Sequence, residues 1–389
     1  MNGTTLTMRR IDRLGALLGI LCACALAFLP FVVFKASRIA SGQTLSLAAA
    51  LPGVLAALIV ALLALAALLS TVGKDRRWRL AGGLLGVLVV AYAVGHAADV
   101  LTPTANRVVR ISPGVGYWVL QLSFALMATN ALTHFRLGPG VRVLCLLVAG
   151  AVLYAAFARG VFDHLSVMRE YAVNADSFGR EARRHVTLAL GSLGAAVLVG
   201  LPTGILCHRV PRLRGAVLQS LNLIQTVPSI ALFGILMVPL GALADAYPWI
   251  GDLGIHGIGA APAVLALFLY SLLPVVANTV VGLGRVSRAT VDAARGMGLI
   301  DRQVLMQVEL PLALPVILTG IRIVLVQNIG LVTIAALIGG GGFGTFVFQG
   351  IGQTAIDLVL LGAIPTVGLA FACALVLDAL VEALNRTQT

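Results

Sequence analysis

Ten long apolar stretches divide this 389-residue chain, and they constrain its fold more than any other feature. An apolar stretch of about 20 residues can cross the hydrocarbon layer of a membrane as a helix, because a helix satisfies its backbone N–H and C=O groups internally. Charged residues make up only 11% of the chain, against roughly 25% in a soluble domain. The sequence therefore predicts an all-α polytopic membrane protein with about ten transmembrane helices. The predicted spans are residues 14–34, 47–72, 80–100, 115–133, 141–158, 186–207, 219–240, 260–283, 313–337 and 358–380.

The order of these stretches predicts three parts. Residues 1–160 form an N-terminal block of five spans, and residues 186–385 form a second membrane domain with five more. Residues 161–185 are too polar to cross a membrane, but their apolar residues recur at helical spacing. We expect this middle segment to be an amphipathic linker helix that lies at the membrane interface.

The net charge of +12 comes from basic residues spread over short connections between the spans. They form no separate basic domain, which argues against a nucleic-acid partner and for contact with membrane lipid. A cytoplasmic N-terminus places most of these residues in the cytoplasm, as the positive-inside rule requires, and puts the C-terminus there too. The outer segment 159–185 opposes this orientation, because it carries five arginines.

A long polar segment interrupts the apolar second domain at residues 285–312, which we call the elbow. Residues 291–315, which run from within the elbow into the next predicted span, read VDAARGMGLIDRQVLMQVELPLALP. We expect two short helices, 292–298 and 301–309, with Gly298 ending the first in a left-handed conformation. Val304, Val308 and Leu312 recur every four residues and predict one apolar face, with the charged residues opposite. Pro311 suits the first turn of the next span.

The chain carries no recognisable catalytic, metal-binding or nucleotide-binding motif. The glycine-rich segment 339–342 lacks the lysine that a phosphate-binding loop requires, so we expect a flexible outer turn there. Its five cysteines fall inside predicted spans without a C-x-x-C pair, and we expect them to be small buried apolar residues. The sequence therefore predicts a protein that is not an enzyme and holds no cofactor or metal of its own.

A few polar residues lie within the predicted spans of the second domain. Arg322 is costly in a membrane, so it either reaches the headgroups, pairs with an acid, or faces a solute pathway. Gln225, Tyr270 and Asn278 are candidates for lining that pathway, and the alternative is that they only bond neighbouring helices. For Asp378 and Glu382 we expect a solvated or inter-subunit position at the end of the last span.

The elbow resembles a known signature. DAARGMG (292–298), nine residues and then VELP (308–311) resemble the EAA motif of ABC importer permeases, with Asp292 in place of the usual glutamate and Val308 in place of isoleucine. The segments LNLIQTVPSIALFG (221–234) and ALFLYSLLPVVANTVVGL (266–283) are similar to permeases of osmoprotectant importers, which take up glycine betaine, choline or carnitine. The resemblance covers about residues 165–385, and residues 1–160 are an addition to the short permeases.

This resemblance implies an ABC type-1 permease core whose elbow docks in a cleft of a cytoplasmic ATP-binding subunit. It further implies a bacterial inner-membrane complex with a second permease chain, identical or homologous, and an extracytoplasmic substrate-binding protein. ATP would be bound by the separate subunits. The elbow positions matched to the motif are Asp292, Ala293, Ala294, Gly298, Val308, Leu310 and Pro311. The residues themselves agree with a docking role, because Arg295 and Asp301 can pair across an interface. Alternatives are a permease for another small solute such as an amino acid, an ion-coupled secondary transporter, or a membrane sensor or scaffold.

Overall fold

The computed structural model describes every residue except 1–12, 39, 74, 103–107, 136 and 387–389. Four basic residues that we used to assign the orientation lie outside the described residues: Arg9, Arg10, Lys74 and Arg136. The chain forms two compact units. Unit 1 comprises Met1–Gly138 and Leu147–Ala172, and unit 2 comprises Pro139–Leu146 and Val173–Thr389.

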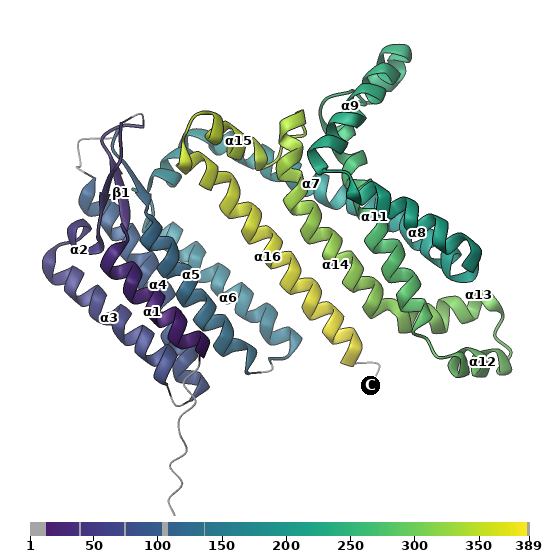
Figure 1. Ribbon diagram of the computed structural model, residues 1–389, viewed down its shortest axis with the longest axis horizontal. Coiled ribbons are helices and arrows are strands. Elements are labelled where there is room, and N and C mark those ends of the chain that lie inside the picture. Colours follow the sequence, from purple (N-terminus) through teal and green to yellow (C-terminus); the bar gives the residue numbers. More distant parts are fainter. Residues whose placement is uncertain (1–12, 39, 74, 103–107, 136, 387–389) are drawn as a thin grey trace, which may run out of the picture. The chain divides into compact units, whose positions relative to one another are not determined.

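Unit 1 is a helical bundle with a small sheet (Figure 1). Its packing is closest where small residues of one helix meet the next: a Cβ atom on Gly83 would lie 2.6 Å from the backbone nitrogen of Ala128, and one on Gly86 would collide with the Phe124 ring. Phe124 is fully buried in the core of this unit. The helices are α1 (Arg13–Phe28), α2 (Leu47–Ala50), α3 (Gly53–Val72), α4 (Arg76–Leu101) and α5 (Val115–Thr133), with parts of α6 (Pro139–Ala158) and α7 (Ser166–Arg209).

The three-stranded sheet of unit 1 was not predicted. Its strands are β1 (Val32–Lys35), β2 (Gln43–Leu45) and β3 (Arg110–Pro113), in the antiparallel order β2-β1-β3. The expected first span, 14–34, is therefore wrong at its end, because α1 stops at Phe28. Pro30 cannot donate to a continuing helix, and the β-branched residues after it pair as a strand instead.

Unit 2 contains the remaining helices, and its centre is α11 packed between neighbours (Figure 1). Gly204 of α7 faces Thr279 of α11, and Gly282 of α11 faces Ala313, so the helix backbones approach closely. The elements are α8 (Pro211–Thr226), α9 (Ser229–Ala246), α10 (Pro248–Asp252), α11 (Ala260–Gly284), α12 (Arg288–Gly296), α13 (Asp301–Gln303), the π-helix η1 (Val304–Glu309), α14 (Leu310–Ala335), the 3-10 turn η2 (Ala336–Ile338), α15 (Gly344–Gly352) and α16 (Ile356–Arg386).

Nine helices among the described residues are long and apolar enough to cross a membrane. The shorter α1, with 16 residues, occupies the place of the first predicted span. Five of the nine correspond to the predicted spans of the second domain: α7, α9, α11, the continuous helix Asp301–Ile338 and α16. The all-α polytopic membrane fold with a five-helix C-terminal core is confirmed.

Two predicted boundaries differ from the structure. The expected linker helix 161–185 is not separate from the following span, because α7 runs from Ser166 to Arg209 with one kink at Asn174. The expected span 219–240 is broken instead, since α8 ends at Thr226 and α9 begins at Ser229. Pro228 forces Val227 out of the helical region (φ −70°, ψ 128°), which ends α8 there.

The cysteines are free, and not all of them are buried. Cys22 and Cys207 are buried, whereas Cys24 and Cys145 are exposed on the surface of the chain. The expectation that all five are buried apolar residues is therefore wrong for these two. Both lie on apolar helices long enough or nearly long enough to cross a membrane, where an exposed small thiol can face lipid.

Candidate functional site

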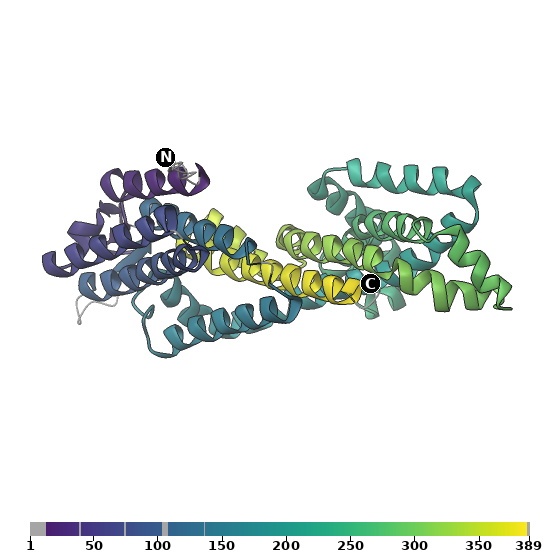
Figure 2. The same cartoon turned by 90° about the horizontal axis from the view of Figure 1, so that it is seen from below.

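The elbow projects at one end of unit 2, where α11 leads into α12 and the chain returns through α13 and η1 to α14 (Figures 1 and 2). Ser287 caps α12, since its side chain accepts a hydrogen bond from Thr290 N at 3.1 Å. Gly298 has φ +89°, which confirms the predicted left-handed residue after the first helix. Local capping thus shapes the elbow before any partner is involved.

The tip of the elbow is apolar and exposed. The side chains of Met297 and Ile300 are 74% and 64% exposed, on either side of Gly298. On α12, Asp292 and Ala293 are exposed while Ala294 is 2% exposed and packs inward. The exposed face therefore combines a small residue, an acid and an apolar tip, which suits insertion into a cleft of another protein.

An ion pair closes the elbow upon itself. Arg295 Nη2 donates to Asp301 Oδ1 at 3.0 Å, and both side chains are exposed. Ile300 N also donates to Gln303 Oε1 at 3.0 Å, which caps the start of α13. We expected Arg295 and Asp301 to pair across an interface, and within this chain they pair with each other. An exposed pair of this kind contributes about 0–1 kcal/mol to stability. Both charges can therefore exchange this pair for ion pairs with a partner protein at little cost.

The second part of the elbow is not the α-helix that we expected. Residues 304–309 form a π-helix, in which Leu310 N donates to Leu305 O, five residues back. The wider turn of a π-helix changes which residues share a face, and here Val304 and Glu309 are both buried. The predicted apolar face of Val304, Val308 and Leu312 is therefore wrong: Val308 is half-buried and Leu312 is 43% exposed.

The motif residues at the end of the elbow begin α14 directly. Leu310 is half-buried, and Pro311 is exposed in the first turn, as predicted. α13, η1, α14 and η2 form one continuous helix from Asp301 to Ile338, so the second part of the elbow, residues 301–309, continues directly into this span. A displacement of residues 301–309 would therefore move the start of α14 with them.

Glu309 is held by a residue that sequence reasoning missed. Arg209, the last residue of α7, donates through Nη2 to Glu309 Oε2. The Glu309 side chain is 4% exposed and that of Arg209 is 34% exposed, so the carboxylate depends on this cation. A glutamate inside an otherwise apolar VELP run was the available signal, but its partner lies 100 residues away.

Gln225 and Tyr270, both pathway candidates, meet at the break between α8 and α9. Pro274 has no N–H group, so the carbonyl of Tyr270 lacks its usual helical donor, and Gln225 Nε2 donates to it at 2.8 Å. The Tyr270 hydroxyl donates to Val227 O at 2.5 Å, where Pro228 has ended α8. These two side chains therefore satisfy backbone groups that two prolines leave open.

The third candidate, Asn278, packs between helices. Its side-chain Nδ2 donates to Pro274 O at 2.8 Å, and a Cβ atom on Gly320 of α14 would lie 2.7 Å from Asn278 Cβ. Its amide is thus half-buried against α14.

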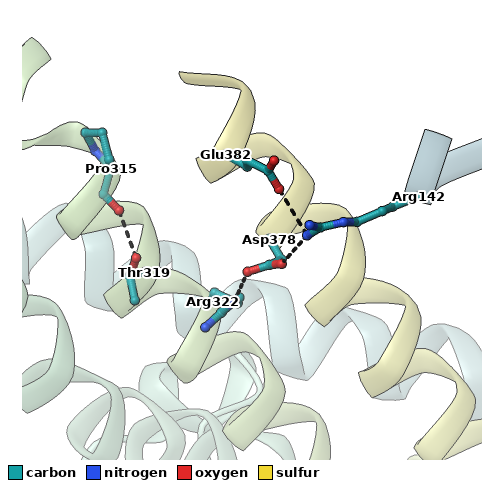
Figure 3. A network of polar contacts seen from close by, with 6 residues as sticks. All are labelled: Arg142, Pro315, Thr319, Arg322, Asp378 and Glu382. Atoms are coloured by element: carbon teal, nitrogen blue, oxygen red, sulfur yellow. Dashed lines mark hydrogen bonds and ion pairs between the residues drawn. The ribbon is translucent and has the colours of Figure 1, made fainter. Parts of the chain in front are cut away.

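Arg322 has an ion-pair partner (Figure 3). Arg322 Nη1 donates to Asp378 Oδ1, and Arg142 of α6 donates to Asp378 Oδ2 at 3.1 Å. Arg142 also lies 3.0 Å from Glu382 Oε2, so two arginines and two acids form a neutral network. Asp378 and Glu382, which we expected to be solvated or at a subunit contact, are 45% and 28% exposed. Of the alternatives for Arg322, structural pairing is the one observed.

A fully buried polar cluster joins three spans. Asn328 of α14 donates through Nδ2 to Ser192 Oγ of α7 and to Ser271 Oγ of α11, both at 3.0 Å, and Ser271 donates back to Asn328 Oδ1 at 3.1 Å. All three side chains are 0% exposed. Sequence reasoning missed the cluster, although an asparagine in the middle of an apolar span was a usable signal.

The glycine-rich turn is held in place, contrary to the expected flexible turn. Three residues on one face of α7 contact it: Glu181 accepts from Gly342 N at 2.5 Å, Arg184 Nε donates to Gly340 O at 2.6 Å, and Phe343 N donates to His185 Nδ1 at 3.2 Å. His185 is fully buried. The polar segment that we interpreted as an interfacial linker therefore fixes the turn.

Among the described residues no group of three or more His, Cys, Asp or Glu side chains is arranged to hold a metal ion. The arrangement of unit 2 is instead that of a permease: a bundle of membrane-spanning helices with an exposed elbow continuous with one of them. Two family models match the chain. Residues 12–168 match the ABC transporter permease YehY, N-terminal domain, and residues 196–389 match the binding-protein-dependent transport system inner membrane component.

Several curated proteins are similar to this chain. The osmoprotectant import permease protein OsmW of Salmonella typhimurium (strain LT2) is 44% identical over 181 residues, which are 46% of this chain and 79% of OsmW. The glycine betaine/carnitine/choline transport system permease protein OpuCD of Bacillus subtilis (strain 168) is 37% identical over 216 residues, covering 55% and 87%. The choline transport system permease protein OpuBD of the same strain is 36% identical over 220 residues, covering 56% and 90%.

The chain belongs to the family of binding-protein-dependent transport system inner membrane components, the permease subunits of ABC importers. Among solved structures, the inward-facing MetNI methionine ABC transporter aligns with a TM-score of 0.46 at 21% identity, covering 53% of this chain and 95% of its own.

Proposed function

We propose that this chain is the permease subunit of an importer for quaternary-ammonium osmoprotectants such as glycine betaine, choline or carnitine. Two permease chains would form the pathway, cytoplasmic ATP-binding subunits would drive it, and an extracytoplasmic binding protein would deliver the solute. The permease itself performs no covalent chemistry and holds no cofactor. Both termini and the elbow would lie on the cytoplasmic side of the inner membrane.

The observation that carries this proposal is the elbow. It exposes Met297, Ile300 and Ala293 on a surface that its own helix caps hold in shape, and its second part, from Asp301, continues without a break into α14. An exposed apolar tip on a rigid helical support is what a docking element requires. A partner that moves the elbow would tilt α14, which packs on α11 and α16.

The substrate class rests on the relatives. OsmW is named for osmoprotectants, and OpuCD and OpuBD are named for glycine betaine, carnitine or choline. These three named solutes share a quaternary ammonium group, which aromatic rings hold through cation–π attraction. In the proposed assembly, the aromatic rings that hold the solute tightly belong to the binding protein. The permease needs only weak contacts with the solute.

Exchanging the charges of Arg295 and Asp301 tests the docking role. The double variant Arg295→Asp/Asp301→Arg can still form the ion pair within the elbow, so its folding is preserved. We expect it to lose ATP-dependent uptake of radiolabelled glycine betaine while remaining in the membrane, and to lose co-purification of the ATP-binding subunit. Arg183→Asp, on an exposed position of α7, is the control and should retain both.

Retention of both uptake and co-purification by the exchanged pair would refute the docking role. Uptake assays in membrane vesicles also distinguish the proposed function from the alternative solutes and mechanisms. Uptake of an amino acid but not of glycine betaine, choline or carnitine would refute the substrate class. Uptake that an ionophore abolishes and that does not need ATP would identify an ion-coupled transporter instead.

A further inference from the structure

Helix α8 has two faces of opposite character. Val217, Leu218 and Leu221 pack on Cys207, Val276 and Val280, which are buried between α7 and α11. Ile224, one turn further on, contacts the cluster that contains Tyr270. α8 therefore lies along the half of α11 that leads to the elbow (Figure 1).

The opposite face of α8 carries Gln219, Asn222 and Thr226, which we call the α8 polar stripe. Their spacing of three and four residues places them on one side of the helix, about 140° from the packed face. All three are exposed, and neither amide has a hydrogen-bond partner within the described part of the chain. The stripe extends toward the exposed Arg212 in the first turn of α8.

The depth of the stripe follows from its neighbours. Gln225, beside Thr226, bonds Tyr270, which lies ten residues from the start of the 25-residue helix α11. At 1.5 Å per residue, Gln219 lies about 10 Å nearer the elbow side than Thr226. The stripe thus extends from the elbow-side end of α8 to the level of about the middle of α11, where α8 breaks at Val227 and Pro228.

We propose that the α8 polar stripe lines the water-filled solute pathway in the elbow-side half of the membrane, where Gln219, Asn222 and Thr226 contact the passing solute. Lipid cannot satisfy two primary amides, whereas water and a polar solute can. Interfaces between membrane helices favour small residues that let backbones approach, and the long Gln219 and the neighbouring Leu223, 70% exposed, do not fit such a contact.

The stripe suits a small zwitterion or hydrated cation. Its two amides are neutral dipoles that can both donate to a carboxylate and accept from the water around a quaternary ammonium group. The Thr226 hydroxyl donates to Leu223 O at 2.7 Å and can still accept. A charged side chain at these positions would hold one end of the solute tightly and slow its release. Helix breaks near the middle of the membrane are where transporters expose such groups to a cavity.

Cysteine accessibility in the whole transporter tests this assignment, which rests on the proposed function only for the identity of the solute. Single cysteines at 219, 222 and 226 are made in an active variant that lacks the five native cysteines. Inside-out vesicles then receive a charged, membrane-impermeant methanethiosulfonate. Controls are Leu221→Cys on the packed face and Leu198→Cys, an apolar position on α7 that is 77% exposed.

We expect the three stripe cysteines to react at least about tenfold faster than both controls, because only a hydrated thiol ionises readily to the reactive thiolate. Added glycine betaine should slow the reaction of the stripe cysteines. Trapping the transporter in another conformational state should slow it too. Stripe cysteines that react as slowly as Leu198→Cys would refute the proposal. So would efficient disulfide formation between two copies at position 222, which would place the stripe in a contact between chains.

Uptake in the native background provides a second test if the cysteine-free variant is inactive. Asn222→Leu and Gln219→Leu should lower the uptake rate at unchanged protein amounts, whereas Ser220→Leu, exposed on the same helix but beside the stripe, should not. Equal uptake in all three variants would refute the pathway role. The stripe cysteines could also react fast at a rate that glycine betaine, choline and carnitine do not change. That result would support the pathway position of the stripe and refute only the proposed substrate class.

Discussion

Arg209, at the end of α7, donates a hydrogen bond to the buried carboxylate of Glu309 in the π-helix of the elbow. This contact joins the elbow to a second span, α7, besides α14. The Glu309 side chain is only 4% exposed, and removing a carboxylate from water carries a desolvation cost that an ion-pair partner offsets. The pair therefore ties the second part of the elbow to the end of α7.

We predict that Arg209→Ala lowers the free energy of unfolding by about 1–3 kcal/mol, because it leaves the Glu309 carboxylate buried and unpaired. The double variant Arg209→Ala/Glu309→Gln should recover part of this loss, since the amide carries no charge. Thermal denaturation of the purified protein in detergent measures both. Equal destabilisation by the single and double variants would show that the ion pair contributes nothing specific.

We predict that Gly342→Ala disrupts the glycine-rich turn. Gly342 has φ +86°, and an added Cβ atom would lie 3.0 Å from His185 Nδ1. The left-handed conformation alone costs an alanine about 1–2 kcal/mol. Lower thermal stability and lower uptake should follow, whereas Gly330→Ala, where nothing lies within 4 Å of the added atom, should be close to wild type. A fully stable Gly342→Ala protein would contradict the fixed turn.

We predict that Tyr270→Phe lowers stability by about 0.5–1.5 kcal/mol through loss of the hydrogen bond to Val227 O. Asn278→Ala should have a similar effect through its contact with Pro274. Because both side chains bond the protein itself, the ratio of uptake rates for glycine betaine and choline should stay unchanged. A changed ratio at normal stability would instead support the alternative that both residues line the pathway.

We predict that a cysteine at position 249 reacts with an impermeant maleimide added to intact cells, and that one at position 302 reacts only after permeabilisation. Trp249 is 61% exposed and Arg302 is exposed, so burial cannot prevent either reaction. Both cysteines are introduced into a variant that lacks the five native cysteines. The reverse labelling pattern would overturn the orientation and place the five-arginine segment 159–185 in the cytoplasm.

The sequence by itself determined which segments are apolar enough to cross a membrane and where the elbow lies between them. It also predicted the left-handed Gly298 and the place of Pro311, because glycine and proline act through their own backbone. Composition and local conformation are properties of neighbouring residues, so they can be read along the chain. The start of α14 and the spans of the second domain were therefore predictable, except for the break at Val227 and Pro228 within the expected span 219–240.

Only the tertiary structure decided where the polar groups within the membrane find partners. The π-helix that buries Glu309 beside Arg209 and the bond from Gln225 to the Tyr270 carbonyl join residues 100 and 45 positions apart. Each contact exists because a low-dielectric interior makes an unpaired polar group costly, and several distant partners could have met that need. Packing selected one of them, and the same selection left the α8 polar stripe exposed.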